Sequence, residues 1–466
     1  PGLNPNTITA GVYIAGGVTV STGAGDQTYT GRVASTNTVT SSNTYGILGS
    51  YGTLVTFTAT TGNITFSGDA SLSASYNNRQ GVLFNPGSIT TTTGNISITG
   101  KSVNKTASRD VWFFTQATAS SVSSTSGNIT ITGTGDGICD VQNATFSTSG
   151  TELFTCASMS FSASNVSMNG TGPLVVEPYG TDWVAETNTT NTTGALDMST
   201  VTVASGKSSV RIGKAGSGGS TQSTKTVSAP SASVAGPLSI YGGDIVLAGT
   251  TTVTHATANL MVKATGYISS GSTPTVSTQA GDLTLWADAD VNKVGSISLG
   301  TSTTAASVST AGGVITLAGG ADDGAATVES GRTSADNRPD GWAYGTSATG
   351  TTNNYEMYGV ALGQNSTVST TNADIFIAGQ MAESRSGTLA MGVRMWPGTQ
   401  VTAGTGRVHA YGKGVSATGA YNYGLMLGGG SSTRAGFITT TGTQSDSIVI
   451  RGEVDGTSSR APGLVL

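Results

Sequence analysis

The chain has 466 residues, of which only 10% are charged and 68 are Gly, and its formal net charge is −5. About a quarter of the residues in an ordinary globular protein are charged. The small net charge and the many Thr, Val and Ile residues argue against disorder and favour an ordered, β-rich protein. Lys and Arg are scattered without a basic stripe, which excludes nucleic acid as a partner. No apolar run reaches the roughly 18 residues of a membrane-spanning helix, so no membrane insertion by this chain is expected.

The chain starts at Pro1 without a signal-peptide pattern, which indicates a processed or excised chain. An octapeptide then recurs as TGNITFSG at 61–68, TGNISITG at 93–100 and SGNITITG at 126–133. Alternating apolar residues, such as Ile96 and Ile98, share one face of a β-strand. Gly near both ends favours turns, and no helical period competes.

Two further β-like runs precede each octapeptide. Residues 81–84 and 88–94 come before the copy at 93–100, and 111–114 and 120–127 come before the copy at 126–133. Three short strands per unit, joined by Gly-rich corners, are typical of one coil of a parallel β-helix, in which each strand pairs with its counterpart one coil on. The crossover rule favours a right-handed coil.

The two cysteines, Cys139 and Cys156, lie close together in the sequence. An even pair at this spacing suits a disulfide in an oxidising, extracytoplasmic setting. The alternative is two free buried thiols in a cytosolic protein. They fall in residues 134–200, where the repeat is hard to follow, and we expect an irregular segment there.

Looser copies of the octapeptide occur later in the chain, at 242–249, 280–287, 312–319, 372–379, 405–412 and 445–452. The clearest neighbours are 32 or 33 residues apart, as from Asn63 to Asn95 and from Asn95 to Asn128. This period predicts one continuous solenoid over 1–466 with about 14 coils. Stacking also explains the low charge, because like charges ~4.8 Å apart on successive coils repel by about 1 kcal/mol even in water.

The G-(N/D)-I-x-I-x-G units, together with GAGDQTYTGRV at 23–33, resemble the repeats of filamentous haemagglutinin-like proteins and giant β-strand-repeat adhesins of Gram-negative bacteria. The resemblance covers most of the chain and is specific to the fold. It implies a right-handed β-helix exported to the cell surface, acting in attachment, biofilm or fibre architecture. No N-terminal secretion domain, C-terminal membrane barrel or sorting motif is recognisable, so the chain is expected to be a piece of a longer protein or a processed subunit.

Asp288, Asp290 and Asn292 alternate like the first half of a calcium loop. Gly at the sixth position and the distal Glu are absent, so the pattern is not an EF-hand. The three side chains could share one face and hold Ca²⁺ weakly, or form an ordinary polar corner. No other cofactor is expected.

A 60-residue gap between repeat copies predicts an inserted loop region at 320–372. It contains the chain's best acidic patch and a Trp, which are candidate ligand-binding residues: Asp322, Asp323, Asp336, Asp340 and Trp342. Paired carboxylates there could serve as acid and nucleophile or bind calcium. The simpler interpretation, which we favour, is a solvated loop where charges escape the stacking repulsion.

Candidate N-glycosylation sequons outside the repeat include Asn188, Asn191 and Asn365. The Asn residues within the octapeptides are expected to serve a turn or an Asn column instead. Aromatic residues of the second half, including Tyr411, are expected to pack beneath loops or cap the apolar column rather than to bind sugars.

These patterns favour a non-enzymatic, extracellular bacterial surface protein, an adhesin or fibre shaft without catalytic residues. Partners would be identical subunits stacked head to tail, and also host or environmental glycans or surfaces. The alternative is a carbohydrate-active β-helix lyase or hydrolase, or a tailspike-like glycan-binding rod. Only two His residues are present, His255 and His409, and neither has a partner motif, which disfavours His-based catalysis or a zinc site.

Overall fold

The computed structural model describes residues 8–33, 43–50, 52–72, 78–103, 108–114, 118–161, 165–183, 196–216, 222, 225–270, 273–324, 328, 336–345, 356–381, 389–415, 421–428, 436–455 and 462–466. These residues form β-strands and no helix, which confirms the predicted all-β class. The chain divides into two compact units, Pro1–Val234 and Ala235–Leu466, and each is described by itself.

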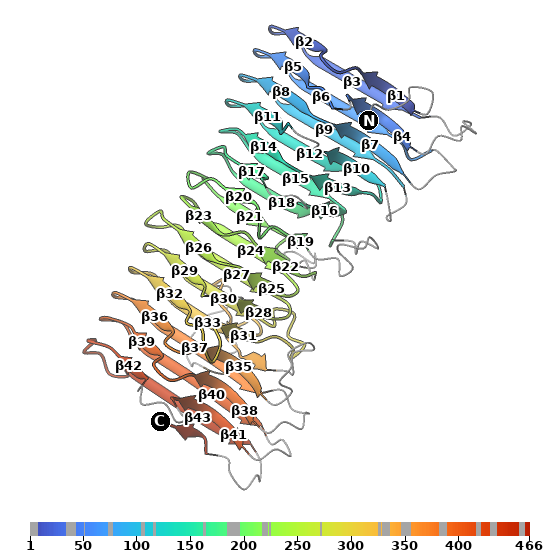
Figure 1. The fold of residues 1–466 in the computed structure, drawn as a ribbon. Coiled ribbons are helices and arrows are strands. Elements are labelled where there is room, and N and C mark those ends of the chain that lie inside the picture. Colours follow the sequence, from blue (N-terminus) through green and yellow to red (C-terminus); the bar gives the residue numbers. More distant parts are fainter. Residues whose placement is uncertain are drawn as a thin grey trace. The chain divides into compact units, whose positions relative to one another are not determined.

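The first unit is built from three parallel sheets (Figure 1). In the first sheet the strand order is β1 (Ile8–Ile14), β4 (Asn43–Gly49), β7 (Arg79–Phe84), β10 (Arg109–Phe113), β13 (Ile138–Val141) and β16 (Ser158–Ser160). The second orders β2 (Thr19–Thr22), β5 (Val55–Ala59), β8 (Gly87–Thr91), β11 (Ser120–Ser124), β14 (Ala144–Ser147), β17 (Ser167–Met168) and β20 (Thr202–Val203). The third orders β3 (Gln27–Arg32), β6 (Ile64–Asp69), β9 (Ile96–Lys101), β12 (Ile129–Gly133), β15 (Glu152–Cys156), β18 (Leu174–Pro178) and β21 (Val210–Ile212). The unit also holds β19 (Leu196–Asp197), its partner β22 (Val227–Ala229), and β23 (Ala232–Val234).

The second unit repeats this plan (Figure 1). Its first sheet orders β25 (Ile245–Leu247), β28 (Ile268–Ser270), β31 (Ile297–Leu299), β35 (Glu356–Leu362), β38 (Leu389–Met395), β41 (Tyr421–Leu427) and β44 (Leu464–Val465). Its second orders β26 (Thr250–Val253), β29 (Thr275–Thr278), β32 (Ser307–Thr310), β36 (Thr367–Thr370), β39 (Gln400–Thr402) and β42 (Phe437–Thr439). In its third sheet the strand order is β24 (Leu238–Gly242), β27 (Leu260–Ala264), β30 (Leu283–Ala287), β33 (Ile315–Gly319), β37 (Ile375–Met381), β40 (Val408–Val415) and β43 (Ile448–Asp455). An additional strand, β34 (Ala343–Gly345), also pairs with β37.

The strand order confirms a parallel β-solenoid. Each strand generally pairs with the one three places on in the chain, as β9 does with β12, so each coil contributes one strand to each of three sheets. The exceptions are β31, β32 and β33, which pair four places on because the additional strand β34 intervenes. Counting third-sheet strands along the ordered path gives seven in each unit, which agrees with the predicted total of about 14 coils. Whether 1–466 is one continuous solenoid concerns the join between the units and stays a prediction.

The inward side chains form apolar columns. Ile64, Ile96 and Ile129 are register partners on successive coils, and none is exposed to solvent. Burying such a side chain contributes roughly 1.5–3 kcal/mol relative to leaving it exposed. Because the column continues from coil to coil, the core is a line of side chains rather than a central cluster.

Aromatic rings extend this core in the first unit. Phe66 stacks on Tyr29 with ring centroids 4.9 Å apart and meets Phe84 edge-on at 5.0 Å. Ring contacts then continue from Phe84 to Phe113 at 5.7 Å and from Phe113 to Phe146 at 5.5 Å. Each such pair is worth about 0.5–1.5 kcal/mol beyond its buried area. The sequence pattern did not predict this line of rings, because the contributing residues come from different sheets.

Gly is required near the start of the octapeptide. A Cβ on Gly94 would lie 1.9 Å from the carbonyl oxygen of Gly62, and a Cβ on Gly127 would lie 1.9 Å from that of Gly94. Successive coils therefore touch backbone to backbone at this corner, and only a residue without a side chain fits.

The Asn of the octapeptide forms a ladder along the solenoid axis. The backbone N–H of Asn95 donates to Asn63 Oδ1 at 2.9 Å, and that of Asn128 donates to Asn95 Oδ1 at 2.8 Å. Asp26 starts the ladder by accepting from Asn63 N at 2.7 Å. Thr151 N ends it by donating to Asn128 Oδ1 at 2.8 Å. The predicted Asn column is therefore a chain of side-chain-to-backbone hydrogen bonds.

The second unit uses the same device. Asp282 N donates to Asn259 Oδ1 at 2.9 Å, and Val314 N donates to Asp282 Oδ1 at 2.9 Å. Further along, Arg407 N donates to Asp374 Oδ1 at 2.8 Å. Asp and Asn are thus interchangeable here because both supply the accepting oxygen.

A second ladder consists of buried hydroxyls at the end of the second-sheet strands. Thr91 Oγ1 accepts from Gly94 N at 3.1 Å and donates to the carbonyl of Gly62 at 3.2 Å. Ser124 does the same one coil on, between Gly127 N and Gly94 O. The hydroxyls thereby satisfy backbone groups that the tight corner would leave unpaired.

Three expectations about the repeat need correction. Spacing between coils is not uniform: β12, β15 and β18 begin at 129, 152 and 174, so these coils are only 23 and 22 residues long. Residues 134–200, expected to be irregular, contain regular strands from β13 to β19. The segment 242–249 was also wrongly grouped with the octapeptides, because Ile245 and Leu247 lie on β25 in the first sheet while β24 occupies the third.

The coil of β15 departs from the pattern because a charged residue replaces an inward Ile. Glu152 is the register partner of Ile129, and its side chain is fully buried. Lys207, also fully buried, places Nζ 2.6 Å from Glu152 Oε2. Paired charges are the usual condition for burying either one.

The ladder gives a direct stability test. Replacing Asn95 with Ala removes the acceptor for Asn128 N and should lower the free energy of unfolding by about 0.5–1.5 kcal/mol. Replacing Asn95 with Asp keeps the accepting oxygen, as at Asp282 and Asp374, and should cost markedly less. Urea denaturation followed by circular dichroism measures both. Equal losses for the two variants would show that the ladder oxygen contributes nothing.

Candidate functional site

The predicted insertion at 320–372 lies where the third sheet passes from β33 to β37, whose first residues are 60 positions apart. Its described part between β33 and β34 packs on the outward face of this sheet. Residues 356–362 and 367–370 instead form β35 and β36, regular strands of the first and second sheets, so the predicted insertion was too long. Val328 joins a buried apolar cluster with Phe376 and Tyr411, and Trp342 packs against the same cluster. The segment is therefore docked on the solenoid. Tyr411 lies in this buried cluster, as predicted, and Trp342 is partly buried beside it rather than presented as a free sugar platform.

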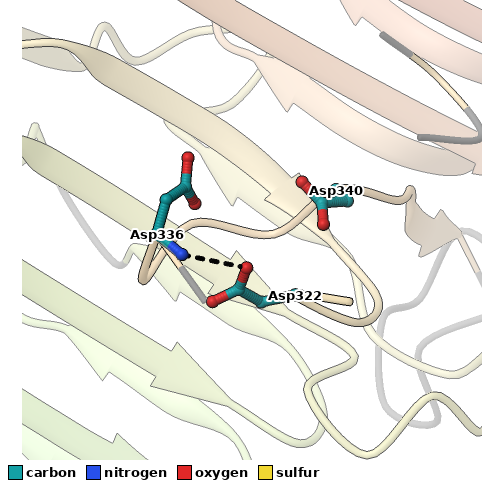
Figure 2. A group of neighbouring side chains, drawn as sticks. All are labelled: Asp322, Asp336 and Asp340. Atoms are coloured by element: carbon teal, nitrogen blue, oxygen red, sulfur yellow. Dashed lines mark hydrogen bonds between the residues drawn. The ribbon is translucent and has the colours of Figure 1, made fainter. Parts of the chain in front are cut away.

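Three of the predicted ligand residues come together (Figure 2). One carboxylate oxygen each from Asp322, Asp336 and Asp340 lies within 4.8 Å of the others, and in the described residues no other group of three or more acidic, His or Cys side chains meets this criterion. Asp340 is buried at 2% exposure. Asp323 is exposed and contributes its backbone N–H instead, which donates to Asp340 Oδ2 at 3.1 Å.

Backbone and guanidinium donors surround these carboxylates. Gly324 N donates to Asp340 Oδ2 at 2.8 Å, and Asn337 N donates to Asp322 Oδ2 at 3.0 Å (the Asp336 N to Asp322 bond is drawn in Figure 2). Arg338 pairs with Asp336, with Nη2 2.7 Å from Oδ2. The donors offset the repulsion between the three charges and fold the insertion into its turns.

A fourth charge lies near the acidic group. Lys263 Nζ lies 3.6 Å from the ring centroid of Trp286, a cation–π contact. Burial lowers the pKa of Lys263, and the negative charge of Asp322 partly opposes that shift. Trp286 Nε1 in turn donates to Gly320 O at 2.7 Å, at the start of the insertion. The cluster is thus tied to the sheet by both charge and hydrogen bonds.

Three monodentate oxygens are fewer than the six to eight that Ca²⁺ takes. Most of the cluster's carboxylate oxygens already accept hydrogen bonds from the loop itself. The chemistry that this arrangement supports best is structural, an acidic knot that holds the insertion against the sheet.

Asp288, Asp290 and Asn292 close a tight loop after β30. Asp288 is fully buried at a φ of 51°, and its Oδ1 accepts from Val294 N at 3.2 Å. Asn292 Nδ2 donates to Asp290 Oδ2 at 2.8 Å, at the solvent-facing side of the loop. Burial raises the pKa of Asp288 to about 6, and the Asp290 charge adds to the shift. The contacts are those of a polar corner; a Ca²⁺ site stays a prediction.

Cys139 and Cys156 are bonded, with Cα atoms 6.1 Å apart, and both are fully buried. The bond joins β13 to the end of β15 within one coil. Among the predicted glycosylation sites, Asn365 is exposed in the turn before β36 with a φ of 58°. Asn188 and Asn191 lie outside the described residues.

The second sheet of the first unit carries two outward columns of hydroxyls. Ser123 aligns with Thr90 on the preceding coil and Ser147 on the next. A depression of about 370 Å³ at the adjoining corner is lined by such side chains and by Asn169. The hydroxyls bond one another, as Thr58 Oγ1 does to Ser21 Oγ at 2.9 Å. The columns therefore add to axial stacking.

Sequence reasoning missed Glu152, Lys207 and Asp110. Asp110 is fully buried and accepts from Ser102 N at 2.7 Å and Gly135 N at 2.8 Å. A signal for Glu152 was available: SGTELFTC at 149–156 matches the octapeptide if its fourth residue is Glu instead of Ile. No sequence pattern predicted that Lys207 is a buried ion-pair partner, because Glu152 lies 55 residues away.

The acidic knot predicts a local loss of stability on substitution. Asp340→Ala removes the acceptor of two backbone N–H groups in a buried position and should destabilise the protein by about 1–3 kcal/mol. Asp323→Ala, which removes a carboxyl at the exposed side of the same turn, should change stability by no more than about 0.5 kcal/mol. Thermal unfolding measures both. If Ca²⁺ raises the Tm of the parent chain but not of Asp340→Ala, the cluster is a cation site instead.

The raised pKa of Asp288 predicts a pH-dependent effect of Asp288→Asn. The folded-state pKa of about 6 exceeds the usual Asp value, so the wild type loses stability as pH rises from that usual value through 6. Asn does not titrate, so the Asp288→Asn variant should gain up to about 3 kcal/mol relative to wild type between about pH 4 and 8. Urea unfolding at several pH values measures the difference. A difference between the variant and the wild type that does not vary with pH would contradict the assignment.

In the part of the chain that the structure describes, no helix has the length and apolar character needed to cross a membrane. No family model, curated protein or solved structure matches this chain.

Proposed function

We propose that this chain is a non-enzymatic β-solenoid shaft of an extracellular bacterial surface structure, and that the shaft lengthens by stacking coil on coil. The resemblance of its repeats to filamentous haemagglutinin-like adhesins supports a surface role in attachment or biofilm. The buried Cys139–Cys156 bond supports an oxidising compartment. Within both units, polar side chains bond from coil to coil, as Asn63 does to Asn95, which suits a mechanical element.

The observation that carries the stacking proposal is the uncovered column at the coil of β41–β43. Val408 on β40 is fully buried, whereas its register partner Ile448 on β43 is 42% exposed. Leu425 on β41 is likewise buried, and its partner Leu464 on β44 is 38% exposed. These inward-facing residues are therefore accessible for contact with a further coil.

A coil with the same three-sheet cross-section fits this surface best, because it continues the registers of all three sheets. The proposed occupant is the β1–β3 coil of a second copy, whose Val12 and Val20 are only partly buried although their register partners Ile47 and Phe57 are fully buried. Burying such apolar area contributes roughly 25 cal/mol per Å². Glycans or host surfaces are proposed as partners of the resulting fibre.

Ile448→Asp tests the stacking. A charge on the uncovered column should raise the concentration needed for assembly at least about tenfold, equivalent to about 1.4 kcal/mol. Val291→Asp is the matched control, since Val291 is 53% exposed in the loop after β30, away from the column. Light scattering with negative-stain microscopy measures assembly, and fibres about one solenoid wide, or a few wound together, are expected. A parent chain that stays monomeric at high concentration would refute self-stacking.

A second candidate, a carbohydrate-active enzyme, is favoured by one observation, the approach of the Asp322, Asp336 and Asp340 carboxylates. Glycosidases use two such groups as acid and nucleophile. Release of reducing ends from a polysaccharide panel, lost in an Asp322→Asn variant that folds normally, would support this function over the shaft.

A further inference from the structure

The buried pair in the first unit links coils that are not neighbours. Glu152 lies at the start of β15, in the apolar column between its register partners Ile129 and Leu174. Lys207 lies between β20 and β21, and β18 separates β15 from β21 in the third sheet. The Lys207 side chain therefore reaches past an intervening coil to bring Nζ within 2.6 Å of Glu152 Oε2.

The two oxygens of the Glu152 carboxyl have different surroundings. Oε1 accepts from Thr148 N at 3.3 Å, and Gly170, whose backbone N–H also donates to this carboxyl, lies against Oε1. Oε2 is in ion-pair contact with Lys207 Nζ. Neither of these two atoms makes a contact with hydrogen-bond geometry. Backbone N–H donors at a carboxyl, here those of Thr148 and Gly170, form the arrangement that stabilises an oxyanion during acyl transfer. An amine faces the other oxygen.

Both side chains are fully excluded from solvent. Burial raises the pKa of the Glu152 carboxyl and lowers the pKa of the Lys207 amine, and their mutual attraction opposes each shift. Burial therefore moves the pair toward neutral acid and neutral amine, the forms that react with each other. Contact at this distance also removes most of the entropic cost of bringing the two groups together.

We propose that Lys207 and Glu152 form a covalent cross-link, an amide between Nζ and the carboxyl carbon Cδ. A proton passes from the ammonium to Oε2, and the free amine attacks Cδ while the two backbone N–H groups hold the charge on Oε1. The Cδ–Oε2 bond then breaks, the departing oxygen takes a second proton from nitrogen, and one water molecule leaves. Nothing is oxidised or reduced, and no co-reactant is needed.

The cross-link closes residues 152–207 into a ring that fixes three successive coils, those of β15, β18 and β21. It is independent of the proposed assembly, because it lies inside one chain. It also explains why Glu152 occupies a column that the two neighbouring coils fill with Ile129 and Leu174.

Mass spectrometry of the purified full chain tests the cross-link. After reduction of the disulfide, the intact mass should fall short of the sequence mass by one water, and a protease digest should yield the peptides of Glu152 and Lys207 joined. Lys207→Met should restore the full mass. Lys101→Met, at an exposed Lys on β9, should keep the deficit relative to its own sequence mass.

A second measurement does not depend on a variant that folds. In denatured wild-type protein, an amine-acylating reagent should label other lysines and leave Lys207 unlabelled. A wild-type chain of full sequence mass, or a labelled Lys207 in the denatured chain, overturns the proposal.

Discussion

Within each unit, neighbouring coils lie one strand spacing apart, so each paired residue sits directly against its counterpart in the next coil. This single constraint determines which residue types occur at each position of a coil. Ile, Leu, Val and Phe stack inward, where contact with an identical neighbour is favourable, as Ile64, Ile96 and Ile129 show. Gly is required wherever the backbones of two coils touch, as at Gly62 and Gly94.

Polar groups obey the same constraint. Asn and Asp oxygens accept from the backbone of the next coil, and Thr and Ser hydroxyls bond one another or the corner carbonyls. Charges are confined to places that supply donors of their own. The acidic group of Asp322, Asp336 and Asp340 is surrounded by backbone N–H groups of the insertion, and Glu152 has Lys207 and two amides.

The fold could be predicted from the sequence because stacked coils require the same residue types at equivalent positions, so the sequence repeats. The octapeptides located β6, β9 and β12 to within a few residues, and the runs at 81–84 and 111–114 located β7 and β10. The coils of β15, β18 and β21 escaped detection because the spacing changes there and because Glu152 breaks the apolar pattern. Its burial depends on Lys207, a contact that only the folded chain creates.

The acidic residues of the insertion could be recognised from composition, and three of them do meet. Their surroundings could not be foreseen, since the donors come from the backbone of Gly324 and Asn337, which any sequence would supply equally. The favoured interpretation of a solvated loop was also wrong, because part of this segment is docked on the sheet. The apolar residues that hold the segment, Val328 and Phe376, are too far apart in the sequence to form a visible pattern.

The Asn ladder also has a direction. In every step the side-chain oxygen belongs to the earlier coil and the N–H to the later one, from Asp26 through Asn128 to Thr151. The two axial faces of a coil are therefore chemically different, one rich in acceptors and the other in donors. Two copies related by a twofold axis would present acceptor to acceptor, so contacts through this face are heterologous and do not close on themselves. A structure grown in this way is polar, with one end that differs from the other.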